Sequence, residues 1–136
     1  MPGQPAAKQG DRVTAMDTHI LMVPAPPGPP VPTPTPGHPF SGILNGNLST
    51  DVFIMGRPAA MQGSTAQNTP PHIPLNPTAP FQVPPTNMAD ITMGSATVYI
   101  NGRPAARNGD MARTCDDVVP APHGQVVAVS TVFVGG

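Results

Sequence analysis

The sequence predicts an all-β domain made of three repeats around one axis. Its 136 residues contain no glutamate and one lysine, so the residues that usually cover helix surfaces are scarce. Valine, isoleucine and threonine, which favour strands, accompany 22 prolines and 14 glycines, which favour turns and loops. A short motif that occurs three times supplies the second basis for the prediction.

The repeated motif is Pro-Ala-Ala followed by a corner. It occurs as PAAKQGD, PAAMQGS and PAARNGD at residues 5–11, 58–64 and 104–110. A short strand closed by glycine also occurs three times, as VFIMG, VYING and VFVGG, ending at residues 56, 102 and 136. The single domain, residues 1–136, therefore divides into repeat units 5–56, 58–102 and 104–136. One unit cannot bury its own apolar face, so we expect three units to pack with pseudo-threefold symmetry.

Each part of the motif has a physical role. In VYING, the alternating residues 98–100 predict a strand with side chains on opposite faces. Asn101 and Gly102 tolerate positive φ and predict a tight turn. The alanines at 105–106 are small enough for backbones to crowd, and Asp110 is placed to accept backbone N–H bonds at the next corner.

Two proline-rich stretches separate these elements, at residues 23–40 and 70–85. Proline lacks a backbone donor, so we expect polyproline II geometry and exclude these stretches from a sheet interior. We interpret them as rigid straps packed along the body; the alternative is a ligand for SH3-like or WW-like domains. The valine-rich residues 126–134 must be paired in the sheet or docked on a partner.

Charge and composition exclude several classes of function. Six basic residues against seven acidic ones give no basic surface for nucleic acid. There is no apolar run long enough for a membrane anchor, and the first 20 residues do not form a signal peptide. We also expect no enzyme: phosphate-binding and G-x-S-x-G motifs are absent, and Asp17, Asp116 and Asp117 are expected to cap turns and loops.

The repeats resemble those of PAAR-repeat proteins, in particular the PAAR-like branch with a long proline-rich first loop. Lys8 and Met61 replace the arginine of the motif, and Ser64 replaces the aspartate. The resemblance covers residues 5–136 and implies a small conical β-structure that caps a trimeric β-helical spike, VgrG-like or from a phage tail. It implies one copy per trimer, a piercing role and help with effector loading.

The same resemblance implies a setting. Such spikes belong to contractile injection machines: type VI secretion systems, extracellular contractile particles and phage tails. The protein would be made in the bacterial cytoplasm, assembled into the particle, and delivered outside the cell or into the target cell on firing.

Five residues could bind a metal, and we expect all of them in the variable loops: His19, His38, His72, Cys115 and His123. By spacing alone, solvated histidines and a buried thiol are the simpler interpretation, because no C-x-x-C or H-x₃-H pattern is present. The resemblance implies a structural zinc ion held by three histidines and one cysteine. Similarity to the PAAR-like pattern favours His19, His38, His72 and Cys115, with His123 in reserve.

A second hypothesis comes from a different class of protein. The chain could be a proline-rich, metal-binding adaptor that is not attached to a spike. In that case a peptide of residues 23–40 alone should bind a partner domain.

Overall fold

The computed structural model describes residues 3–135. Their regular secondary structure consists of strands, with no helix among these residues, as predicted. None of these residues forms a helix that could span a membrane. The strands are β1 (Gln4–Pro5), β2 (Arg12–Val23), β3 (Val31–Gly46), β4 (Phe53–Ile54), β5 (Arg57–Pro58), β6 (Thr65–Asn68), β7 (Met88–Ile91), β8 (Tyr99–Ile100), β9 (Arg103–Pro104), β10 (Met111–Arg113), β11 (Gly124–Val127) and β12 (Phe133–Val134).

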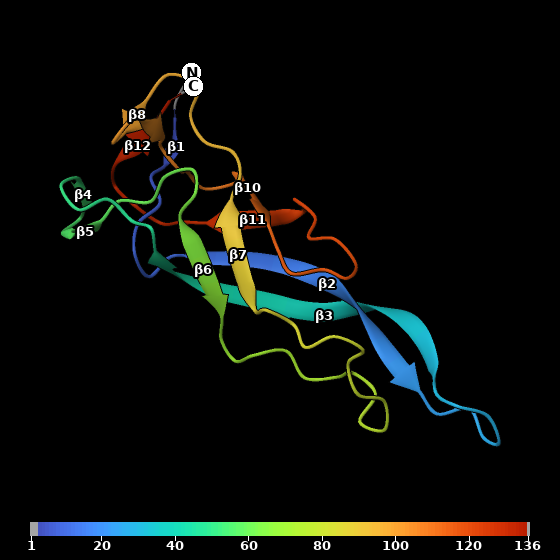
Figure 1. Ribbon diagram of the computed structural model, residues 1–136. Helices are drawn as coiled ribbons and strands as arrows, with labels where there is room; N and C mark the ends of the chain where they lie inside the picture. The colour runs from blue at the N-terminus through green and yellow to red at the C-terminus, as the bar shows by residue number, and fades with distance from the viewer. Residues whose placement is uncertain (1–2, 136) are drawn as a thin grey trace.

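Six strands form a closed antiparallel barrel in the order β10-β11-β2-β3-β6-β7. Three separate two-stranded pairs, β1–β12, β4–β5 and β8–β9, lie together at one end of the molecule (Figure 1). The β2–β3 hairpin projects beyond the barrel at the opposite end, so the molecule narrows away from the three pairs (Figure 1).

The strand order repeats three times along the chain. Each repeat contributes one barrel hairpin, β2–β3, β6–β7 or β10–β11, and the small pairs alternate with these hairpins. The pair β1–β12 joins the two ends of the chain and completes the circle. This arrangement confirms the predicted all-β fold with pseudo-threefold repeats, while the exact unit boundaries stay a prediction.

Three alanines explain why the motif needs small residues. The N–H of Ala7 donates to the carbonyl of Ala106 (2.9 Å), that of Ala106 to Ala60 (3.1 Å), and that of Ala60 back to Ala7 (3.0 Å). All three side chains are at most 1% exposed. Three backbones can close this ring only because no larger side chain separates them.

The same side-chain-to-backbone hydrogen bond stabilises the corner after the alanines in all three repeats. A side-chain oxygen accepts the backbone N–H three residues earlier: Lys8 to Asp11 (3.0 Å), Met61 to Ser64 (3.0 Å) and Arg107 to Asp110 (2.7 Å). The hydroxyl of Ser64 therefore replaces the aspartate of the motif without loss of the bond. The predicted turn after β8 is also present, with φ of 51° at Asn101 and 80° at Gly102.

The first proline-rich stretch differs from the prediction. Residues 31–40, expected as a polyproline II strap, belong to β3 and pair with β2. The register sets Pro34 opposite Ile20 and Pro32 opposite Met22.

The backbone of β2 shows why prolines are tolerated there. The carbonyl of Ile20 accepts from the N–H of Gln82 (2.9 Å), and the N–H of Met22 donates to the carbonyl of Pro80 (2.8 Å), both away from β3. In an antiparallel pair, residues opposite such positions also direct their backbone groups outward. The nitrogens of Pro32 and Pro34 therefore face the outer edge of β3, where no donor is required.

The second proline-rich stretch lies outside the sheets, as expected, while its polyproline II geometry stays a prediction. Residues 70–85 contain no strand of the sheets and pass beside β2 through the isolated bridge between Leu21 and Phe81. The valine-rich segment is paired within the fold, since β11 belongs to the barrel and β12 pairs with β1.

Candidate metal centre

Two of the predicted ligands lie on strands and not in loops, which corrects the expectation from sequence. His19 belongs to β2 and His38 to β3, and both are 0% exposed. Alternate residues of β2 face inward, so Asp17 and His19 follow Val13 on the buried side.

A β-bulge brings His38 inward. The pairing of β2 with β3 shifts between Asp17 and His19, so that Pro36 and Gly37 lie opposite Thr18. Gly37 has a φ of 90°, a conformation that glycine adopts without strain. The extra residue changes the phase of β3, and His38 and Phe40 become buried.

The other two predicted ligands come from loops that return over the hairpin. His72 lies between β6 and β7, where its backbone N–H donates to the side-chain oxygen of Asn87 (2.8 Å). Cys115 lies between β10 and β11, and the residues after it bind the edge of β2. Thr18 donates to Asp116 Oδ1 (2.7 Å) and accepts from the N–H of Asp117 (2.8 Å).

These elements bring three imidazoles and a thiol together at the end of the barrel. The ring centroids of His19 lie 5.3 Å from His38 and 4.7 Å from His72, and those of His38 and His72 lie 5.9 Å apart. The Cys115 sulfur is 3.8 Å from His19 Nε2. Three imidazoles on one tetrahedral zinc ion would have centroids about 5 Å apart, so the arrangement fits a zinc ion.

Both ring nitrogens of His38 have hydrogen-bond partners outside this group. Its Nδ1 lies 3.1 Å from the carbonyl oxygen of Thr35, and its Nε2 accepts from the N–H of Leu75 (3.3 Å). Burial, and then the nearby His19, lower the pKa of His38, which favours the neutral ring that a metal requires. Its donor atoms lie outside the tightest set described next.

The tightest set of donor atoms includes a residue that the sequence analysis did not select. Donors of Asp17, His19, His72 and Cys115 all lie within 4.8 Å of one another. Asp17 was expected to cap a loop, but it is a 0% exposed strand residue. The Asp-x-His spacing on a strand could have indicated it, because residues i and i+2 share a face.

Asp17 is the polar centre of the cluster. Its Oδ2 lies 3.0 Å from His72 Nε2 and accepts from the Cys115 thiol at 3.5 Å, and its Oδ1 accepts from the Thr114 hydroxyl. Burial tends to raise the pKa of Asp17, but the hydrogen bonds from His72 and Thr114 outweigh it, so the pKa is lowered. The carboxylate is therefore held in its charged form.

Two features leave the cluster incomplete. His19 Nδ1 is the buried side-chain polar atom without a hydrogen bond among residues 3–135, although Asp117 Oδ2 lies 3.4 Å away. Burial, and then the charge of Asp17, raise the pKa of Cys115 to about 12, so its sulfur stays a thiol unless a cation replaces the proton. A metal ion would supply that cation.

His123, the reserve ligand, lies apart from the other histidines. Its side chain is 39% exposed, and its Nε2 contacts Asp116 and lies 3.6 Å from Asp17 Oδ1. These three residues form a second group of donors on the outer side of Asp17.

A family model described as the PAAR motif matches residues 1–121 and 82–136, which together span the chain. No curated protein matches the sequence.

Proposed function

Because the chain belongs to the PAAR-motif family, which acts at spike tips of contractile injection systems, we propose that it caps and sharpens a trimeric β-helical spike. Proteins with this motif are structural parts of the tip and associate with a VgrG-like spike. In this proposal one copy binds per trimer, and the metal centre strengthens the free end. Help with effector loading is a further part of the proposal.

The observation that carries the proposal is a threefold set of exposed aromatic residues. Phe53, Tyr99 and Phe133 occupy the same position in the three repeats, and they are 55%, 59% and 59% exposed. The next residues in the chain, Ile54, Ile100 and Val134, are buried and belong to one apolar cluster. Aromatic side chains exposed in threefold register match the end of a threefold partner.

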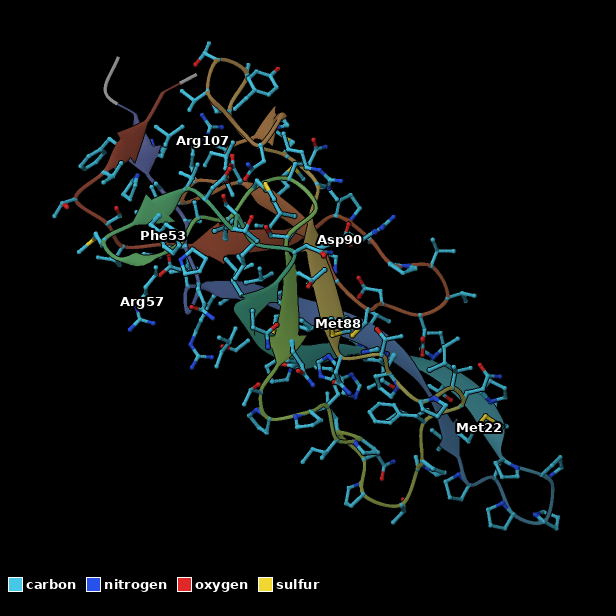
Figure 2. The ribbon with its side chains drawn as sticks, turned by 60° about the vertical axis from the view of Figure 1, so that its left-hand side comes forward. Met22, Phe53, Arg57, Met88, Asp90 and Arg107 are labelled. Carbon is cyan, nitrogen blue, oxygen red and sulfur yellow. The ribbon has the colours of Figure 1, made fainter. Side chains whose placement is uncertain are left out.

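The position of this aromatic surface indicates how the protein would be oriented on the spike. Arg57 and Arg103 are equivalent residues of the β4–β5 and β8–β9 pairs that carry Phe53 and Tyr99, and both are exposed. Figure 2 shows Phe53 and Arg57 at one end of the molecule and Met22 of the projecting hairpin at the other. The aromatic end would therefore contact the spike, and the β2–β3 hairpin would point away from it.

The metal part of the proposal assigns His19, His38, His72 and Cys115 as ligands of a structural zinc ion. Imidazole and thiolate suit zinc, and four protein ligands complete a structural site. The ion would join residues from all three repeats at the end of the barrel opposite the aromatic surface. His123 remains the reserve.

Binding to a purified trimeric VgrG-like spike tests this function. Wild-type protein should bind with one copy per trimer by native mass spectrometry. Changing Phe53, Tyr99 and Phe133 together to Asp should weaken binding by about 100-fold or more, because buried aromatic residues dominate interface energies. Val31→Asp, an exposed apolar position at the opposite end, is the control. Unchanged binding of the triple variant would refute the proposed contact surface.

The adaptor hypothesis has less support. Residues 31–40 form a strand paired with β2, and a polyproline ligand needs a free extended segment.

A further inference from the structure

We propose that Asp17 is the charge-balancing carboxylate of the metal centre and that it orients His72 for metal binding. This inference rests on the metal site proposed above, and it concerns a residue outside that ligand set.

The first step is the burial of the charge. Asp17 is 0% exposed, and its charged contacts are with histidines only. Within residues 3–135, the lysine and arginine salt bridges engage Asp11, Asp110 and Asp90 instead. A carboxylate buried without a permanent countercharge is costly, so its presence calls for a cation.

The second step is the charge of the metal site. A Zn²⁺ ion with one thiolate and three neutral imidazoles carries a net charge of +1 in a buried place. The Asp17 carboxylate, which contacts both the Cys115 sulfur and the His72 ring, makes the whole group neutral. Asp116 and Asp117 are partly exposed and accept N–H bonds from Thr18 and Ile20, so water and the backbone already stabilise them.

The third step is orientation. A hydrogen bond from His72 Nε2–H to Asp17 Oδ2 (3.0 Å) places the ring proton on Nε2 and leaves the lone pair on Nδ1 for a metal. The Thr114 hydroxyl donates to the other oxygen and holds the carboxylate in place. Carboxylates that bind a ligating histidine in this way usually raise metal affinity by about 10-fold to 100-fold.

The test compares Asp17→Asn with wild type for two cations of different charge. Zn²⁺ affinity of the full chain should fall by about 10-fold to 100-fold, measured by competition with a chromophoric chelator. The amide oxygen of the Asn variant can still accept the bond from His72 Nε2–H, so the change removes the charge and keeps the orientation. Cu⁺ binds similar soft ligands and is already neutral with one thiolate, so its affinity should be unchanged or higher. Asp90→Asn, which removes a charge from an exposed pair with Arg113, should change neither affinity.

Three other results of this experiment would each contradict one part of the proposal. Unchanged Zn²⁺ affinity in Asp17→Asn would refute the role of Asp17 and leave the zinc site intact. Equal loss of Zn²⁺ and Cu⁺ affinity would show a merely structural role and also refute charge balance. Absence of zinc binding in wild type would overturn the metal part of the proposed function itself.

Discussion

The six alanines of the three motifs carry the strictest steric requirement in the chain. They are at most 1% exposed, and one member of each pair closes the ring of backbone hydrogen bonds. A side chain larger than methyl has no space there, so the motif selects residues by size and not by chemistry.

Enlarging one of these residues should destabilise the protein. We expect Ala106→Val to lower the free energy of unfolding by about 1–3 kcal/mol, because added methyl groups would separate the backbones of the ring. Urea titration at a fixed zinc concentration measures this, with Ala96→Val at an exposed position as the control. Equal stability of the two variants would contradict the crowding of the ring.

At the scale of elements, the β2–β3 hairpin has an outer edge protected by proline. On the side away from β2, β3 pairs with β6 over residues 42–46 and has no strand partner over residues 31–37 within the described part of the chain. An exposed edge strand can pair with another copy, and proline prevents this because it has no N–H.

Removing the prolines should therefore expose the edge. We expect Pro32→Thr with Pro34→Thr to increase self-association above that of wild type, measured by sedimentation over a range of concentrations. Replacing Pro26 and Pro27 with Ser in the connecting turn removes two prolines without changing the edge and should not have this effect. If the edge variant sediments like wild type, the edge is protected in another way.

At the scale of the molecule, the proposed metal would join the three repeats at the end opposite the ring. His19 and His38 come from the first repeat, His72 from the second and Cys115 from the third. The long connections there contain few buried apolar residues, so a metal would supply much of their stability.

Metal removal should therefore lower stability. We expect one zinc ion per chain by elemental analysis, and a chelator should lower the free energy of unfolding by about 3 kcal/mol relative to zinc at 100 times Kd. Cys115→Ser should lose most of the zinc, whereas His123→Ala should keep it. If the His123 variant loses its zinc instead, His123 is a ligand in place of one of the four chosen residues. If no sample contains zinc, the metal part of the proposal is wrong.

Local sequence was sufficient for the parts of the fold that depend on neighbouring residues. The turn at Asn101 and Gly102 follows from the conformational freedom of those residues, and the threefold arrangement follows from three copies of one motif. The resemblance also selected three histidines and a cysteine that the fold brings together, although their role as ligands stays a prediction.

Other features depended on contacts between distant segments. Proline in β3 is compatible with a strand only because β2 pairs with one side and leaves the other free, and no local pattern contains that information. From the sequence, Asp17 was expected to cap a loop. In the structure it lies on a strand and contacts His72 and Cys115, which are 55 and 98 residues away in the chain. Backbone preferences are short-range and can be read from the sequence, whereas the burial and pairing of a charge are decided by the tertiary structure.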